Sequence, residues 1–483
     1  MPRTGTGGRT TTFSRREVLA MAAGAPALLR AGRSRCNVLF VVSDDLNNVA
    51  GCYGHPIAKT PNMDRLARRG MLFDRAYCQY PLCQPSRASF LSGLRPETTR
   101  VWTLETPTRQ YVGDATFLPE LFRRNGYYTA HAGKIYHTGE QCEDARSWDE
   151  EVRESGKTPP AAALLESGKA AGPKGHSFEW AKVRTEDAQT PDGTAARKTV
   201  EWMDRAAKDG KPFFLGAGFR RPHAPYAAPK KYFDLYPPES IPLPRTSAEE
   251  FKRILPAAVN HDPPDRPLPD ADIRRFLAAY YASVTFMDAQ LGVLLDAMDR
   301  LRLWDTTAVV FFGDNGYHLG EHGGLWHKNS LFEESARVPL IVAAPGIRGA
   351  GHSPRLVELV DLYPTLTELC GLKPPSNLEG TSFVALLENP ERRWKTGAFT
   401  MQGRGKERTE AAKDIEFFGK SVRTEAWRYT EWDEGRQGVE LYDHRSDPGE
   451  LQNVAQDPQH APARAGLRDL LRRGSRAALP PGA

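Results

Sequence analysis

Four short apolar runs, rich in β-branched and aromatic residues, predict strands that are buried on both faces. Polar residues follow every run, so each strand is expected to deliver a reactive side chain where it ends. The runs and the polar residues that follow them are 37–42 with Asp44 and Asp45, 127–132 with Lys134 and His137, 212–218 with His223, and 307–312 with Asp314 and Asn315.

Amphipathic segments alternate with these runs and predict helices over 61–69, 118–125 and 273–301. Alternation of strands and helices is typical of an α/β fold with a large, mostly parallel sheet flanked by helices. Ligands bind such sheets beyond the carboxyl ends of the strands, where the polar residues stand. The proline-rich stretch 222–269 is expected to be a long loop over that edge.

The pattern changes after about residue 390, where short alternating segments predict an antiparallel sheet. These segments are 422–424, 428–432 and 439–443, and a helix is expected near 463–473. We therefore expect a large domain over 36–390 and a smaller C-terminal α+β domain over 391–483.

Charge and composition indicate which partners and cross-links to expect. The net charge is +5, from 65 basic and 60 acidic residues, and the sequence has no basic run interleaved with aromatic residues, so no nucleic-acid partner is expected. The sequence has no uninterrupted apolar run of about 18 residues, so no membrane span is expected either. Six cysteines form no CxxC pair. Cys83 belongs to the motif described below, and the remaining five cysteines are an odd number, so a full disulfide framework is not expected.

The N-terminus, 1–35, resembles a twin-arginine export signal. Arg15 and Arg16 precede a short, mildly apolar stretch, 20–29. We expect an exported, periplasmic protein with cleavage between residues 27 and 35. The alternative is a basic, unstructured terminus.

One motif is decisive. Cys83-Gln84-Pro85-Ser86-Arg87 precedes Leu91-Ser92-Gly93, and Pro85 suits the first turn of a helix, whose N-terminus favours an anion. The motif resembles that of the sulfatase family of the alkaline-phosphatase-like superfamily. Other motifs stand in that family's order: Asp44-Asp45, Gly133-Lys134-Ile135-Tyr136-His137, Pro222-His223, Asp314-Asn315-Gly316 and Trp326-His327-Lys328. The resemblance runs from about residue 37 to residue 453. The segments 95–100, 213–225 and 320–323 are most similar to the iduronate-2-sulfatase branch of the family.

The resemblance implies an enzyme that hydrolyses sulfate monoesters. The resemblance implies that a maturation enzyme oxidises Cys83 to formylglycine. An unmodified thiol that attacked sulfur would form an S-sulfate, from which sulfate is not easily released. Carboxylate and amide oxygens suit calcium, or alternatively magnesium. The implied roles are metal binding by Asp44, Asp45, Asp314, Asn315 and modified Cys83; charge support by Arg87; clamping of sulfate oxygens by Lys134 and Lys328; and proton transfer by His137 and His223.

The implied substrate is a sulfated carbohydrate, in the manner of an iduronate-2-sulfatase. Two positions depart from that branch: Asn47 stands where it carries arginine, and Tyr317 where it carries tryptophan. Arg404, Lys406 and Arg408 are candidate substitutes for the lost guanidinium. The alternatives are a phosphonate monoester or phosphodiester hydrolase with the same nucleophile, a choline- or other sugar-sulfate sulfatase, and a catalytically silent carbohydrate-binding relative.

Overall fold

The structure, a computed structural model, describes residues 35–153, 161–171, 177–259, 268–347, 351–405 and 415–480. The expected export segment lies outside these ranges apart from Arg35. Within the described ranges no helix is both long and apolar enough to cross a membrane.

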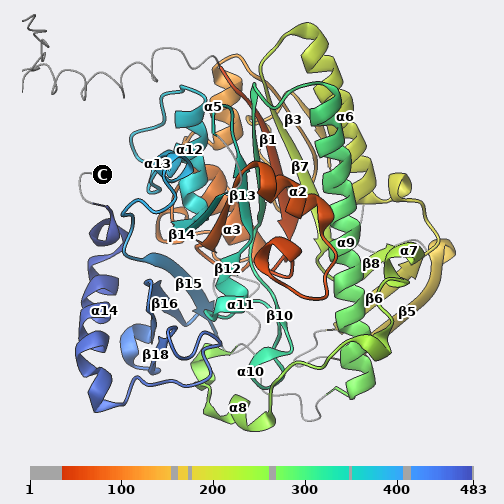
Figure 1. Cartoon of the computed structure of the whole chain (residues 1–483). Coiled ribbons are helices and arrows are strands. Elements are labelled where there is room, and N and C mark those ends of the chain that lie inside the picture. The colour runs from red at the N-terminus through yellow and green to blue at the C-terminus, as the bar shows by residue number, and fades with distance from the viewer. Residues whose placement is uncertain are drawn as a thin grey trace, which may run out of the picture.

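A nine-stranded, mostly parallel sheet forms the centre of the molecule (Figure 1). Its order is β12-β2-β13-β9-β1-β7-β3-β4, with β14 paired to β2. All four expected strands are in it, so the expected α/β fold is confirmed. The bounds are β1 Asn37–Asp44, β2 Met71–Tyr77, β3 Tyr128–Gly133, β4 Glu150–Val152, β7 Phe213–Pro222, β9 Thr307–Gly313, β12 Arg337–Val338, β13 Leu340–Ala343 and β14 Gly351–Glu358.

Strand β1 lies between β7 and β9 and runs parallel to both. Successive side chains of a strand point to opposite faces. Leu39 and Val41 accordingly enter one hydrophobic core, and Phe40 and Val42 enter the other. Helices cover both faces of the sheet, α2 Pro61–Arg69, α6 Pro191–Asp209 and α9 Asp270–Arg300 on one, and α3 Cys83–Ser92, α5 Leu118–Arg124, α12 Leu362–Leu369 and α13 Val384–Glu388 on the other (Figure 1).

One edge of the sheet is antiparallel and was not predicted. β13 pairs antiparallel with both β9 and β2, and β12 pairs antiparallel with β2. Strands β12 and β13 are very short, and their pairing with β2 joins segments more than 250 residues apart, which no local pattern encodes. The remaining short elements are α4 Pro96–Thr99, β10 His318–Leu319, α10 Glu321–Gly324, β11 Trp326–His327 and α11 Glu333–Ala336.

The expectation of a long loop over 222–269 is partly wrong. The stretch contains β8 (Tyr226–Pro229), α7 (Lys230–Phe233) and α8 (Ala248–Arg253). β8 completes a separate three-stranded sheet with β5 (Leu164–Ala171) and β6 (Ser177–Val183). The proline content obscured β8, which gains its order from pairing with β6.

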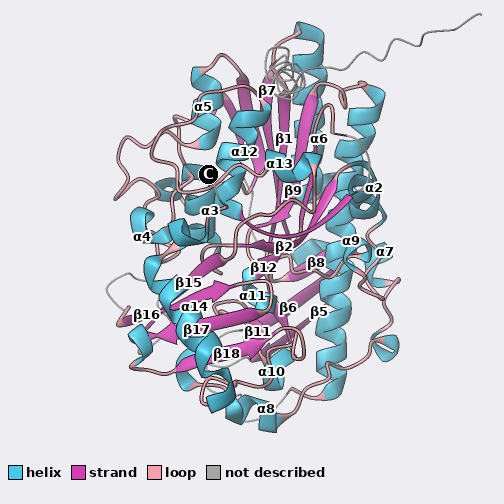
Figure 2. Cartoon of the chain, turned by 60° about the vertical axis from the view of Figure 1, so that its left-hand side comes forward, coloured by secondary structure: helices cyan, strands magenta, loops and turns pink. Residues whose placement is uncertain are grey.

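The C-terminal antiparallel sheet is present, as expected (Figure 2). Tyr429 and Leu441 of this sheet form a small core with Leu467 of the C-terminal helix. The first strand was not predicted, and the domain boundary at 390 stays a prediction. The bounds are β15 Ala398–Arg404, β16 Phe417–Arg423, β17 Trp427–Trp432, β18 Val439–Asp443 and α14 Ala461–Arg473.

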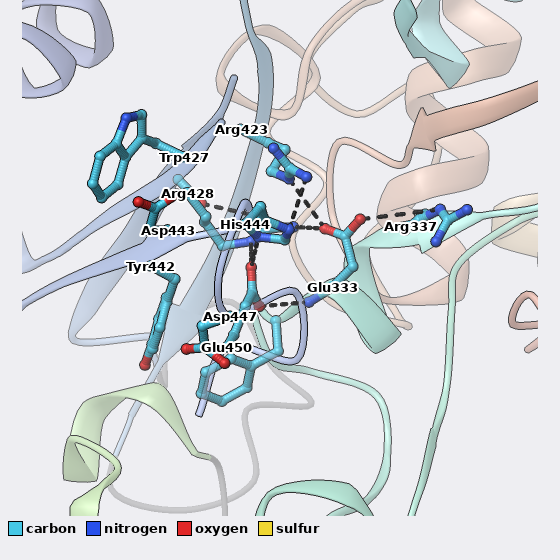
Figure 3. A network of polar contacts seen from close by, with 12 residues as sticks. Glu333, Arg337, Arg423, Trp427, Arg428, Tyr442, Asp443, His444, Asp447 and Glu450 are labelled. Carbon is cyan, nitrogen blue, oxygen red and sulfur yellow. Dashed lines mark hydrogen bonds and ion pairs between the residues drawn. The ribbon is translucent and has the colours of Figure 1, made fainter. Parts of the chain in front are cut away.

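Ion pairs connect this sheet to the segment just after Lys328 (Figure 3). The Arg428 guanidinium donates at 2.5 Å to Glu333 Oε2 and at 2.5 Å to Glu450 Oε1. His444 Nε2 lies 2.7 Å from the same oxygen of Glu450. Because Glu333 opens α11, five residues beyond Lys328, this network fixes one end of the loop that carries the lysine.

Candidate active site

The carboxyl ends of β1 and β9 bring three carboxylates together. Asp44 ends β1, and the Asp314 backbone N–H donates to the carbonyl of Ser43 at 3.1 Å. Asp45 has a left-handed backbone (φ 60°), rare for a residue other than glycine and concentrated at functional sites. Its N–H donates at 3.0 Å to Asp314 Oδ1. Oxygens of Asp44, Asp45 and Asp314 lie within 4.8 Å of one another, and all three residues are buried.

Cys83 is the first residue of α3 and is 1% exposed. Its Sγ lies 3.7 Å from Asp45 Oδ1, 3.8 Å from Asn315 Nδ2 and 3.0 Å from Lys328 Nζ. Burial, with Asp44 adding to it, raises the pKa of the thiol to about 12. The unmodified cysteine is therefore neutral near pH 7 and is a poor nucleophile.

Arg87 lies one turn further along α3 and is fully buried. Its Nε donates at 2.8 Å to Asp314 Oδ2, and its second terminal nitrogen lies 3.2 Å from Asp44 Oδ1. It also donates to the carbonyl oxygens of Lys134 and Ile135. Arg87 thus ties the ends of β1 and β9 to the segment that follows β3.

Two lysines pair with the carboxylates. Lys134 Nζ lies 2.5 Å from Asp44 Oδ2, and Lys328 Nζ contacts Asp45 Oδ1. Burial alone would lower the pKa of Lys328, but Asp45 and the other acidic groups raise it above its usual range, so the ammonium stays charged. His327 and Asn329, on either side of Lys328, both have a φ of 70°, so a left-handed backbone presents this lysine.

The two expected proton-transfer histidines flank the carboxylates. His223 Nε2 lies 3.7 Å from Asp45 Oδ2, and its Nδ1 lies 2.6 Å from the carbonyl oxygen of Ala224. Burial lowers the pKa of His223 well below its usual value. Burial and Lys134 lower the pKa of His137 to about 2, and its Nδ1 has no hydrogen-bond partner in the part of the chain that is described. Both imidazoles are therefore neutral in this arrangement.

The residues present fit a hard divalent cation. Burial, together with Asp44 and Asp45, raises the pKa of Asp314 to about 7 against the opposing effect of Arg87. Burial and Asp44 likewise raise the pKa of Asp45. The buried Oδ1 of Asn315 has no hydrogen-bond partner among the described residues. A cation would relieve the repulsion and use this amide oxygen, and oxygen donors are the ligands that calcium and magnesium take.

Asn47 and Tyr317, expected at the substrate side, belong to a buried polar scaffold. Asn47 Nδ2 donates at 2.9 Å to the Tyr317 carbonyl. The Tyr317 hydroxyl lies 2.7 Å from His327 Nδ1, beside Lys328. Tyr280 of α9, which lies in the segment 273–301 that was expected only as an amphipathic helix, donates at 2.7 Å to the carbonyl of Asp45. These residues support the site through buried hydrogen bonds. Because the Asn47 amide donates to the Tyr317 carbonyl, Asn47 does not face the substrate side of the site.

Arg404 is not a substitute for the missing guanidinium, so that expectation is wrong. It is buried, and it donates to the carbonyl oxygens of Ala257 at 2.8 Å, Ala258 at 2.9 Å and Asn329 at 2.8 Å. Its place on β15, which the sequence did not reveal, turns it inward. Lys406 and Arg408 lie outside the described residues.

The other histidines near the motifs have polar partners of their own. His322 Nε2 lies 3.0 Å from Glu334 Oε2, in keeping with a role in shaping the loop. His318 Nε2 lies 2.7 Å from Ser330 Oγ, and His131 Nε2 lies 3.6 Å from a carboxylate oxygen of Glu151.

Comparison with known proteins places the chain in a family. A family model described as Sulfatase matches residues 36–372, and a second, described as N-sulphoglucosamine sulphohydrolase, C-terminal, matches residues 320–477. The chain belongs to the sulfatase family, and the family recognised from the sequence is confirmed.

Three curated relatives align over most of their length. A protein named Sulfatase from Formosa agariphila is 33% identical, over 87% of this chain and 83% of the relative. Iduronate 2-sulfatase of Homo sapiens is 31% identical, over 87% of this chain and 90% of that enzyme. Choline-sulfatase of Rhizobium meliloti is 30% identical, over 88% and 83%.

Solved structures share the fold. The phosphonate monoester hydrolase of Agrobacterium radiobacter superposes with a TM-score of 0.75 at 23% identity, over 90% of this chain and 94% of that one. A structure described as a 2-O GAG sulfatase gives a TM-score of 0.69 at 23% identity, over 91% and 92%. At these identities the likeness establishes the architecture.

Proposed function

We propose that this sulfatase-family hydrolase is formylglycine- and metal-dependent and cleaves sulfate monoesters of glycans in the manner of an iduronate-2-sulfatase. The observation that carries the proposal is the position of Cys83. Its sulfur lies between a cluster of buried carboxylates and the ammonium of Lys328, at the first turn of a helix. An unmodified, neutral thiol has no evident use in such a place.

Formylglycine at residue 83 would supply an aldehyde hydrate with one hydroxyl for attack on sulfur and a second for release of sulfate, and a divalent cation would lower the hydrate's pKa. Asp44, Asp45, Asp314 and Asn315 would hold the cation together with modified residue 83. Arg87 would keep the ends of β1 and β9 in place through its contacts with Asp44 and Asp314.

The charges of the site favour an anionic substrate. Three buried carboxylates face three buried or nearly buried cations, Arg87, Lys134 and Lys328. With a divalent cation added, the site carries a net positive charge, which attracts a sulfate ester. Lys134 and Lys328 bind as point charges and would hold two of the ester's non-bridging oxygens.

We assign a different proton transfer to each of the two histidines, His223 and His137. His223 is oriented through Nδ1 by the carbonyl of Ala224, which leaves Nε2 free to face the reacting groups beside Asp45. We assign it to protonate the leaving oxygen. Because Nδ1–H is held by the carbonyl of Ala224 and a neutral imidazole has only one N–H, Nε2 would have to take up a proton before it could donate one. His137, neutral because of burial and Lys134, would accept the proton of the remaining hydroxyl as sulfate departs.

The proposed substrate class rests on similarity over nearly full length to iduronate 2-sulfatase. Choline-sulfatase has nearly the same identity to this chain. Neither Asn47 nor Arg404 is placed to bind a uronate carboxylate. The proposal is therefore a terminal, 2-O-sulfated sugar, recognised chiefly through its sulfate.

The testing experiment has two arms. Mass spectrometry of the peptide that contains Cys83 should reveal an aldehyde in place of the thiol when the chain is made alongside a formylglycine-generating enzyme. Matched aryl sulfate and aryl phosphonate esters should then be compared. Faster sulfate release supports the proposal, whereas faster phosphonate cleavage assigns the same nucleophile to phosphonate monoester hydrolysis. Absence of both reactions from the aldehyde-containing protein would indicate a silent carbohydrate-binding relative.

We also propose export through the twin-arginine route, on the strength of Arg15 and Arg16. That route carries folded proteins, which suits an enzyme whose Cys83 is oxidised first. Substitution of both arginines by lysine should leave the protein in the cytoplasm, whereas the unchanged chain should be recovered from the periplasm.

A further inference from the structure

Two buried cysteines that the proposed chemistry does not use lie against each other. Cys36 directly precedes β1, and Cys370 directly follows α12. Their Sγ atoms are 2.7 Å apart, although 334 residues separate them in the sequence. The two residues are 6% and 2% exposed. The contact therefore connects the first strand of the sheet to a helix that packs on its face.

The separation is shorter than an ordinary non-bonded contact. Even carbon atoms, which are smaller than sulfur, sit at about 3.5–4.0 Å when they are not bonded. A disulfide has its sulfurs at about 2.05 Å, so a shift of about 0.7 Å joins this pair. The two sulfur atoms are therefore already close to bonding distance.

The surroundings favour a structural role over a chemical one. Both cysteines belong to the hydrophobic core that contains Tyr127 and Leu369. In the described part of the chain, neither sulfur belongs to a group of side chains able to share a metal ion. Burial and the neighbouring thiol raise the pKa of Cys370 far above its usual range, so a reactive thiolate is disfavoured.

The contact is not a general feature of the cysteines here. The Cys78 sulfur approaches the carbonyl of Ser335 at 3.9 Å, and the Cys142 sulfur approaches that of Leu104 at 3.6 Å. These are ordinary contacts of buried thiols with backbone oxygens. Cys142, which lies outside the proposed catalytic machinery, serves as the matched control below.

We infer that Cys36 and Cys370 form a disulfide when the protein meets a thiol-oxidising environment. The reaction with a disulfide oxidant such as oxidised glutathione is balanced. Each thiol loses its proton, the sulfur–sulfur bond of glutathione disulfide breaks, a bond forms between the two cysteine sulfurs, and two molecules of reduced glutathione leave. Two electrons pass from the protein to the oxidant.

The cross-link would close a loop that contains most of the folded chain. Such a bond stabilises the protein mainly by restricting the unfolded state, more so for longer loops. Cys36 precedes the start of β1, whereas Asp44 ends the same strand at the active site. The bond should therefore raise thermal stability and leave sulfate-ester hydrolysis unchanged, so its failure is distinguishable from failure of the proposed function.

The experiment uses the full chain, recovered from the periplasm and, in parallel, refolded from denaturant in oxidised and reduced glutathione. Protein is unfolded without reductant, its thiols are alkylated, and its peptides are analysed by mass spectrometry. We expect one linked pair carrying Cys36 and Cys370, two hydrogen masses below the sum of the separate peptides, that disappears on reduction. Cys142→Ser should keep the linked pair, and Cys370→Ser should lose it.

Thermal unfolding supplies the second readout. Reduction should lower the Tm of the unchanged protein and of Cys142→Ser by several degrees, and should not change the Tm of the double variant Cys36→Ser/Cys370→Ser. Recovery of both cysteines as alkylated thiols, or as separate glutathione adducts, from folded protein of either source would overturn the inference. So would a loss of Tm on reduction that the double variant shares.

Discussion

The ammonium of Lys328 lies 3.0 Å from the Sγ of Cys83, although 245 residues separate them. The same ammonium contacts Asp45, so one cation touches both the residue proposed for modification and a candidate metal ligand. The left-handed backbone on either side of Lys328 and the ion pairs that fix α11 hold this geometry. The proposed site of modification and the lysine proposed to bind sulfate are therefore in direct contact.

Cys83→Ala should fold and lose nearly all sulfatase activity, because alanine offers no side chain that can become an aldehyde. The Tm should remain near that of the unchanged protein, because Lys328, the one close polar partner of the thiol at 3.0 Å, keeps its contact with Asp45. Sulfate release from an aryl sulfate is the measurement. Cys142→Ser, which alters a buried cysteine elsewhere, should keep full activity. More than a small residual rate in Cys83→Ala would show that another group attacks sulfur.

Lys328→Met should reduce kcat/KM for sulfate esters by about 10²–10³, the usual cost of one preorganised contact to developing negative charge. Methionine keeps much of the volume and removes the charge. Lys252→Met, which removes an exposed lysine paired with Glu249, is the control and should leave kcat/KM unchanged. Equal, small effects of the two substitutions would argue against a clamp at Lys328.

One hard divalent cation per chain is expected at Asp44, Asp45, Asp314 and Asn315. Exhaustive chelation should abolish activity and lower the Tm, and calcium or magnesium should restore both. A ligand present at a hundredfold its Kd stabilises the folded protein by about 2.7 kcal/mol. Elemental analysis should find the ion in the unchanged protein and in Glu434→Gln, an exposed acidic control, but much less in Asp314→Asn. Full activity in the metal-depleted protein would refute the site.

Substrate preference should reflect the missing guanidinium. An arginine–carboxylate contact contributes about 1.5–3 kcal/mol, roughly ten- to a hundredfold in selectivity. Neither Asn47 nor Arg404 offers it, so kcat/KM for a 2-O-sulfated uronate disaccharide should exceed that for a neutral-sugar counterpart by less than about tenfold. Both should be better substrates than choline sulfate.

Arg404→Gln tests this reading, because a structural arginine should affect stability and leave the acidic-to-neutral ratio unchanged. A lower acidic-to-neutral ratio in Arg404→Gln would show that Arg404 contributes to substrate binding. A clear preference for choline sulfate would refute the iduronate-type proposal without affecting the assignment to the sulfatase family.

The His322–Glu334 pair should make stability depend on pH. Burial opposes protonation of His322, but Glu334 raises its pKa to about 9. A group whose pKa is higher in the folded state stabilises fully below its unfolded pKa, about 6.5, and that contribution is lost as the pH rises through about 9. The loss is on the order of 3 kcal/mol at most. Urea unfolding of the unchanged protein and of His322→Gln should differ less at pH 9.5 than at pH 6; a constant difference would contradict the assignment.

The sequence by itself determined four central strands of the sheet and the polar residues that follow them. Apolar runs such as 37–42 predicted buried strands because local periodicity reports local burial. Since parallel strands share a carboxyl edge, Asp44 and Asp314 were expected to meet, and their oxygens do lie within 4.8 Å of each other. The Cys83 motif was legible because its residues are neighbours in the chain.

Only the tertiary structure decided which distant groups become partners. Arg404 was a candidate for substrate binding until β15 turned it toward the carbonyls of Ala257 and Asn329. Likewise, nothing near Cys36 in the sequence points to Cys370. Such pairings depend on the packing of segments that are far apart in the chain, and local propensity carries no information about them.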